Sequence, residues 1–146
     1  MKAQKIIDGT KEVADEFGVP LFEIAYRISY RNEIISCLRS VKVNEEHKLV
    51  LLSNKHWEDS YDGYSSVGGD ELIDALKDFG DYDIVCQIDN GYLAPSKIKF
   101  TDEEGCVDGE LICDETYDAT PFVQEAKKDP YLLESLNYKF IFATRL

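Results

Sequence analysis

The sequence is poor in the residues and segments on which many protein functions depend. It contains only two histidines, His47 and His56, and none of its four cysteines stands in a C-x-x-C arrangement. A zinc site built from Cys and His is therefore not expected, and Cys86 and Cys113 are expected to be small, buried, unbridged side chains. No apolar run approaches the ~20 residues of a membrane span, and segment 1–8 lacks the apolar region of a signal peptide. These absences predict a cytoplasmic protein.

Motifs for catalysis and for cofactor binding are also missing. No Ser or Cys lies in a recognisable nucleophile turn that either histidine could serve. Gly68-Gly69 precede a predicted helix, but Asp70 and Glu71 follow where a phosphate-binding loop carries its lysine. The acids that begin at Glu58 resemble the first half of a calcium loop, yet the twelfth position is Gly69 and not the required glutamate. We expect no enzymatic activity, no cofactor and no metal site.

Acidic residues dominate what is present. The 146 residues carry a formal net charge of −13. Residues 1–42 hold seven Lys or Arg and six Asp or Glu, a net charge of +1, whereas residues 43–146 hold nine Lys or Arg and 23 Asp or Glu, a net charge of −14. So negative a field repels nucleic acid and anionic membranes and speeds the encounter with basic partners.

The first 42 residues predict two helices. Apolar residues recur at helical spacing over residues 4–17, Gly18 ends that helix, and Pro20 suits the first turn of a second helix that runs to about Arg39. Ala14, Gly18 and Ile24 occupy the small, glycine and branched positions of a helix-turn-helix, with Val19 in the apolar position after the glycine. Residues 10–29 therefore resemble the helix-turn-helix family of DNA-binding motifs.

That resemblance implies a transcriptional regulator, which is the alternative function. Its DNA contacts would be Tyr26, Arg27 and Arg31 on the second helix. Most base-reading positions at the start of that helix are apolar here, however, whereas the family usually has polar residues that bond to base edges. A helix-turn-helix shape used only for packing is at least as consistent with the sequence.

The rest of the chain predicts an acidic α+β domain. Residues 47–53 form an apolar strand, residues 54–69 a long loop, and residues 70–79 an amphipathic helix capped by Asp70. Alternating residues then predict three strands joined by turns at Asn90-Gly91 and Asp102–Gly105. Two short helices, each introduced by a proline, and a strand over residues 138–144 complete the chain. The predicted fold is thus α+β: an N-terminal helical pair (residues 1–42), then a mainly antiparallel sheet of about five strands packed by helices (residues 43–146), the two expected to form one compact unit.

The charge and the interleaved aromatic residues favour a binding protein over an enzyme. Aromatic side chains can anchor an interface while the acids around them select a basic partner. The chain is similar in size and charge to small acidic inhibitors from phages and mobile elements, including anti-CRISPR and anti-restriction proteins, and to toxin-immunity proteins. This resemblance implies an inhibitor of a basic nucleic-acid-handling protein that acts by nucleic-acid mimicry. The expected partner-binding residues are Trp57, Asp59, Tyr61, Asp62, Tyr64, Asp81, Asp83, Glu103 and Glu104.

Overall fold

The protein is described by a computed structural model that covers residues 1–54, 67–88 and 91–117 and the backbone of strand 139–143. Its two α-helices are α1 (Ala3–Phe17) and α2 (Gly69–Leu76), and a short 3₁₀ helix, η1, spans Leu21–Glu23. The strands are β1 (Ala25–Tyr30), β2 (Glu33–Cys37), β3 (Ser40–Asn44), β4 (Leu49–Ser53), β5 (Asp83–Ile88), β6 (Gly91–Glu103), β7 (Cys106–Thr116) and β8 (Lys139–Ala143).

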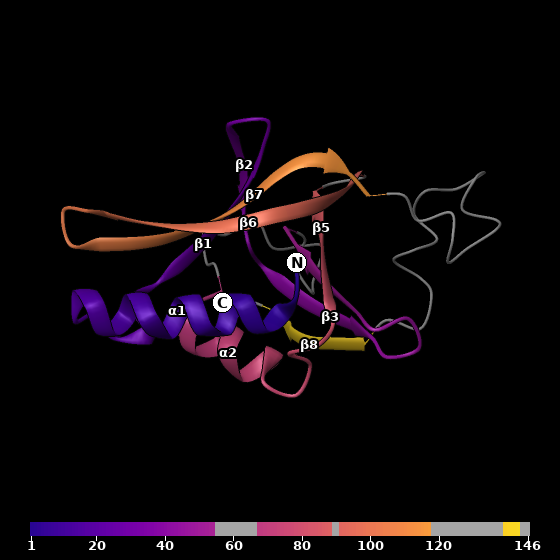
Figure 1. The fold of residues 1–146 in the computed structure, drawn as a ribbon, viewed down its shortest axis with the longest axis horizontal. Coiled ribbons are helices and arrows are strands. Elements are labelled where there is room, and N and C mark those ends of the chain that lie inside the picture. Colours follow the sequence, from indigo (N-terminus) through magenta and orange to yellow (C-terminus); the bar gives the residue numbers. More distant parts are fainter. Residues whose placement is uncertain (55–66, 89–90, 118–138, 144–146) are drawn as a thin grey trace.

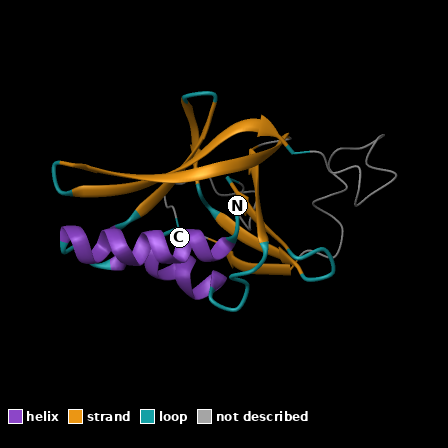
Figure 2. Cartoon of the chain, viewed as in Figure 1, coloured by secondary structure: helices purple, strands orange, loops and turns teal. Residues whose placement is uncertain are grey.

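The strands form one mixed sheet. Its order is β2-β1-β7-β6-β5-β4-β3-β8, with parallel pairings of β1 with β7 and of β4 with β5 and antiparallel pairings elsewhere. The sheet is curled, and α1 and α2 lie on the same side of it (Figure 1, Figure 2). The predicted fold class is therefore wrong in two respects: the described residues contain no N-terminal helical pair, and the sheet has more than five strands and is mixed, with two parallel pairings.

The second predicted helix is a β-hairpin. The first helix ends as expected at Gly18, whose φ of 64° is the left-handed conformation that favours glycine. Beyond η1 the chain extends into β1, which turns into β2 through Arg31 and Asn32, with φ values of 50° and 69°. Two consecutive left-handed residues make the tight hairpin turn whose twist matches that of the strands, and asparagine tolerates this conformation well. The helix-turn-helix prediction for residues 10–29 is wrong, because β1 stands where its second helix was expected.

Several other elements follow the prediction. The meander β5–β6–β7 is antiparallel, and β6 turns into β7 through Glu104 and Gly105, within the predicted turn. β4 lies inside the sheet, between β3 and β5. Helix α2 begins one residue before Asp70, because Gly68 is its N-cap and donates its N–H to Glu71 Oε1 at 3.0 Å. The two predicted C-terminal helices lie outside the described residues.

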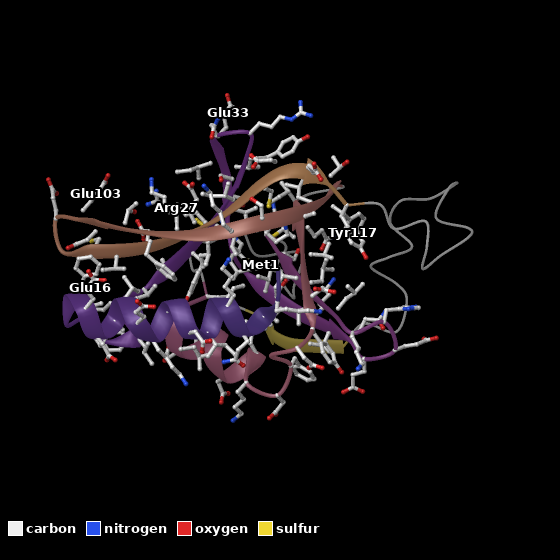
Figure 3. All side chains as sticks on the ribbon, viewed as in Figure 1. Met1, Glu16, Arg27, Glu33, Glu103 and Tyr117 are labelled. Atoms are coloured by element: carbon white, nitrogen blue, oxygen red, sulfur yellow. The ribbon has the colours of Figure 1, made fainter. Side chains whose placement is uncertain are left out.

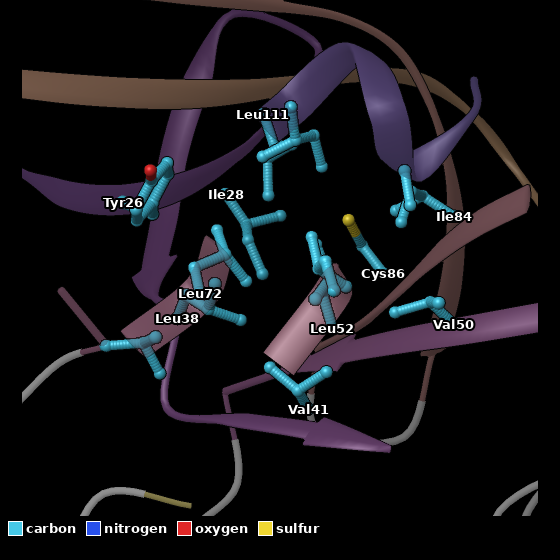
Figure 4. Packing of buried hydrophobic residues seen from close by; sticks show 14 of the residues in the cluster. Tyr26, Ile28, Leu38, Val41, Val50, Leu52, Leu72, Ile84, Cys86 and Leu111 are labelled. Carbon is cyan, nitrogen blue, oxygen red and sulfur yellow. The ribbon is translucent and has the colours of Figure 1, made fainter. Parts of the chain in front are cut away.

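The main core lies between the sheet and the two helices. Figure 4 shows buried side chains meeting there, including Tyr26 of β1, Leu52 of β4, Leu72 of α2 and Leu111 of β7. A second cluster forms on the other face of the sheet from Leu49, Leu51, Val85 and Tyr92. Strands β4 and β5 thus bury both faces, which explains their nearly continuous apolar sequences.

Tyr26 ties α1 to the sheet. Its side chain is fully buried, and its hydroxyl shares a hydrogen bond of 2.6 Å with the Thr10 hydroxyl of α1. Burial raises the pKa of Tyr26, an effect larger than the opposing one of the Thr10 hydrogen bond. The folded protein therefore favours the protonated, neutral form of the Tyr26 side chain.

We predict that Tyr26 contributes to alkaline unfolding. Below its unfolded pKa near 10, the phenol is neutral in both states and stability does not depend on its titration. Above pH 10 the unfolded chain releases this proton and the folded chain keeps it, so the free energy of unfolding falls by up to about 1.4 kcal/mol per pH unit. Urea unfolding of the wild type and of Tyr26→Phe between pH 8 and 11 measures this slope. The variant should start about 1 kcal/mol less stable and lose stability less steeply; parallel profiles would contradict the assignment.

Candidate functional site

Helix α1 is fixed at its N-terminus by the segment that leads into β5. The backbone N–H groups of Ala3 and Gln4 donate to the carbonyls of Tyr82 and Gly80, each at 2.9 Å. These bonds satisfy donors that a helix start leaves without intrahelical partners. Six residues from Ala3 to Ala14 then bury one side of α1 against the core. The helix is held in one orientation, and its other side remains exposed.

A groove of about 730 Å³ runs between α1 and β6. Its volume falls within the range of ordinary ligand-binding clefts, ~300–1,000 Å³. The lining comes from successive turns of the helix and from two alternate residues of the strand: Gln4, Lys5, Asp8, Gly9, Glu12, Val13, Glu16, Phe17, Ile98 and Phe100. α1 and the β6–β7 ribbon run alongside one another over this length (Figure 1).

The floor of the groove is apolar and depends on two glycines. A Cβ at Gly9 of α1 would lie 3.0 Å from Phe100 Cε2, and a Cβ at Gly109 of β7 would lie 3.0 Å from Phe100 Cε1. The Phe100 ring therefore packs directly against backbone on two sides. Ile98, two residues earlier on β6, lines the same floor. Phe17 at the end of the groove is 43% exposed, so the apolar surface is open to a ligand.

One wall of the groove is a row of carboxylates, Asp8, Glu12 and Glu16, which we call the acid row. They stand four residues apart on α1, so they project from one face about 6 Å apart along the helix axis. All three residues are exposed. Asp8 accepts a hydrogen bond from Gln4 Nε2 at 2.9 Å, and within the described ranges Glu12 and Glu16 form no ion pair. The acid row can therefore bind cationic groups from a partner.

The described residues include four of the nine predicted partner-binding residues. Trp57, Asp59, Tyr61, Asp62 and Tyr64 fall outside the described residues. Asp81 and Asp83 lie at one site, and Glu103 and Glu104 lie at another.

Asp83 begins β5 beside the start of α1, where its carboxylate lies 3.1 Å from Lys2 Nζ, and Asp81 lies in the turn just before it. Glu103 and Glu104 lie at the β6–β7 turn, on the same side of the view as Glu16 near the end of α1 (Figure 3). The two acidic pairs are thus at opposite ends of α1, a helix about 22 Å long.

The residues proposed for DNA contact do not form a recognition surface. The Tyr26 side chain lies in the core, and Arg27 forms an ion pair of 3.0 Å with Asp108 of β7. Arg31 stands over the Tyr30 ring, 5.0 Å from its centroid, in the β1–β2 turn. No helix carries these three residues, so the geometry that the alternative function requires is missing.

The groove was not predicted from the sequence. The acid row could have been found from its spacing, because acids recur every fourth residue of a predicted helix at positions 8, 12 and 16. The net charge of residues 1–42 does not reveal this row, because the same acids offset lysines and arginines in that segment. The apolar floor has no comparable pattern in the sequence, since only the folded sheet brings Ile98 and Phe100 beside α1.

The two buried cysteines and the described acids are poorly placed for thiolate and metal chemistry. Cys86 and Cys113 are buried as predicted, and a hydrogen bond with Cys113, together with burial, raises the pKa of the Cys86 thiol and disfavours the thiolate. Within residues 1–54, 67–88 and 91–117, no three His, Cys, Asp or Glu side chains gather closely enough to hold a metal ion. Nor does any helix in the described part have the length and apolar character needed to cross a membrane.

Comparison of the chain with protein-family models, with curated proteins and with solved structures gives no match. The groove and the charge of the chain are therefore the features that point to a function.

Proposed function

We propose that this chain is a non-enzymatic binding protein that recognises a basic protein partner. The observation that carries the proposal is the groove between α1 and β6, which combines the acid row with the apolar floor around Phe100. A lysine or arginine side chain has the matching form, because its apolar stem can lie along a floor while its charged head meets a carboxylate. The net charge of −13 adds long-range attraction toward such a partner.

Nucleic-acid-handling enzymes are the partner class that we favour. Their substrate grooves are basic because they bind phosphates, so an acidic protein can occupy them and exclude the nucleic acid. The function we propose at this finer level is inhibition through such occupancy. The helix-turn-helix alternative does not fit this chain, since β1 and β2 replace the helix that it needs.

Binding of short labelled peptides tests the basic-partner proposal. We expect a fluorescein-labelled peptide of twelve alternating Lys and Thr residues to bind in fluorescence anisotropy at 50 mM salt and to bind several-fold more weakly at 200 mM. A peptide of alternating Glu and Thr and a labelled duplex DNA should not bind, because the chain repels both. The proposal fails if neither the Lys-Thr peptide nor a helix-forming Lys-Ala peptide of equal charge binds at 50 mM salt.

A further inference from the structure

Strand β6 has an open edge above the groove. Its first residues, Gly91–Leu93, pair with β5 on one side, but from Lys97 to Glu103 the strand pairs only with β7. Among the described residues, no strand lies against the other edge of this segment. The segment pairs with β7 in continuous register over seven residues, from Lys97 opposite Ile112 to Glu103 opposite Cys106.

The hydrogen-bond pattern shows which backbone groups this edge presents. Glu104 and Gly105 form a two-residue turn, so the Glu103–Cys106 pair that closes it exchanges its hydrogen bonds directly. Antiparallel pairs alternate, so every second residue back along β6 points its N–H and C=O away from β7. These residues are Ile98, Phe100 and Asp102.

The far side of β7 confirms this alternation. The Cys113 carbonyl accepts a hydrogen bond of 3.0 Å from the Arg31 N–H at the end of β1, so this residue of β7 faces β1. Its neighbour Ile112 accordingly faces β6, opposite Lys97. Ile98, Phe100 and Asp102 therefore hold three donors and three acceptors at an edge with no strand partner in the described part of the chain.

The same residues of β6 turn their side chains toward α1. Ile98 and Phe100 line the groove, whereas Lys97 and Lys99 alternate to the opposite face of the sheet. A strand added at the open edge would place every second side chain over the floor and toward the acid row. Its other side chains would lie beside Lys97 and Lys99, where further positive charge is repelled.

We propose that β6 accepts an extended segment of the basic partner as an additional strand, with lysine or arginine at alternate positions directed to the acid row. This inference rests on the proposed function and specifies how the groove is used. Same-face residues of a strand are about 6.4–6.8 Å apart, close to the spacing of about 6 Å in the acid row. Backbone hydrogen bonds supply affinity in this mode, and the alternate side chains supply specificity.

The groove favours a strand over a helix for a physical reason. A helix satisfies its own backbone groups and would leave the N–H and C=O groups of Ile98, Phe100 and Asp102 bonded only to water. The strands at the two ends of the sheet, β2 and β8, are less suited to strand addition. Each is five residues long, and a register shift interrupts the pairing of β1 with β2 and that of β3 with β8. Short length and a bulge are the features that protect sheet edges from pairing.

Backbone N-methylation of the Lys-Thr peptide tests strand addition directly. One methylated peptide carries the methyl groups on the lysine amides and the other on the threonine amides. An added strand turns only one of these two sets toward β6, so one peptide should bind about tenfold or more weakly and the other like the parent. Loss on the lysine amides means antiparallel addition, and loss on the threonine amides means parallel addition. Equal affinity of the two methylated peptides overturns the inference.

Amide hydrogen exchange of the unaltered chain gives a second readout. In the free protein, the amides of Ile98, Phe100 and Asp102 should exchange faster than those of Lys99 and Thr101, which bond to β7. Saturating Lys-Thr peptide should slow exchange at the first three by about tenfold or more and leave the others unchanged. If the peptide binds without protecting the first three amides, the segment does not bind as a strand.

A matched pair of variants isolates one backbone donor. Asp102→Ala removes the carboxylate and keeps the outward N–H, whereas Asp102→Pro removes both and keeps the bonds to β7. We expect Asp102→Pro to bind the peptide several-fold more weakly than Asp102→Ala; equal affinity would count against the edge. If the Asp102→Pro variant does not fold, amide hydrogen exchange of the unaltered chain decides whether the peptide binds at the edge of β6.

The outcomes separate the two proposals. If both methylated peptides bind like the parent, the groove binds basic segments in another form, and only strand addition is overturned. If neither the Lys-Thr peptide nor the helix-forming peptide binds, the proposed function itself fails.

Discussion

Changing Asp8, Glu12 and Glu16 together to lysine is expected to weaken binding of the Lys-Thr peptide by roughly 100-fold at 50 mM salt. The change converts one wall of the groove from attractive to repulsive for cations, at three points about 6 Å apart. The fold should be preserved, because all three residues are exposed and lysine favours helices as well as glutamate does. Anisotropy titrations at 50 and 200 mM salt measure the change.

A charge-matched control separates the groove from the net charge. Glu33, Asp74 and Asp78 are exposed acids outside the groove, and changing all three to lysine alters the net charge equally. Exposed charges farther than about 10 Å from a ligand are largely screened at 0.1 M salt, so the control should lose only a few-fold in affinity. Equal losses in the two triple variants would mean that the whole charge of the chain, and not the acid row, attracts the peptide.

The second large effect is expected at Gly69, where Gly69→Ala should lower the free energy of unfolding by about 3 kcal/mol. A Cβ there would lie 2.6 Å from the backbone carbonyl oxygen of Leu21, closer than such atoms approach. The oxygen belongs to η1, and the Gly69 N–H also donates to the Ile24 carbonyl at 2.9 Å. The clash is therefore with a backbone held in place, and α2 must move away from the core.

Urea unfolding followed by far-UV circular dichroism measures this loss. Gly91→Ala is the control, since among the described residues its Cβ would meet the Ile88 carbonyl oxygen alone, at 3.7 Å, an ordinary contact. That variant should differ from the wild type by less than 1 kcal/mol. A Gly69→Ala protein as stable as the control would show that α2 and η1 can separate without cost. Because domains of this size are stable by only ~5–15 kcal/mol, a loss of 3 kcal/mol is readily measured.

The N-terminal hairpin shows where sequence reasoning failed. Residues 19–39 contain both a proline suited to a helix start and apolar residues compatible with helical spacing, so the local pattern favours a helix. Tyr26 and Ile28 also alternate as strand residues, and the pairing of β1 with β7 decides between the two patterns. That pairing joins Ala25 to Asp108, more than 80 residues apart, and no local pattern can report it.

One part of the groove could be predicted from the sequence and the other could not. The four-residue spacing of the acid row can be recognised in the sequence of α1, because a helix repeats every 3.6 residues. The apolar floor of the groove cannot be recognised there, because Phe100 contacts Gly9 and Gly109 only after β6 has been placed between α1 and β7. The open edge of β6 likewise follows from which strands end early: β5 pairs with only three residues of β6.

The sequence by itself determined the net charge, helix α1 with its glycine stop, the β5–β6–β7 meander and the acid row. Each of these depends on residues near one another in the chain, through periodicity, turn conformation or composition. The tertiary structure alone decided that residues 25–37 are strands, that the sheet is mixed, and that an apolar floor and an open strand edge lie beside the acid row. Those outcomes depend on pairings between distant segments, whose hydrogen bonds and burial outweigh the small differences in local preference.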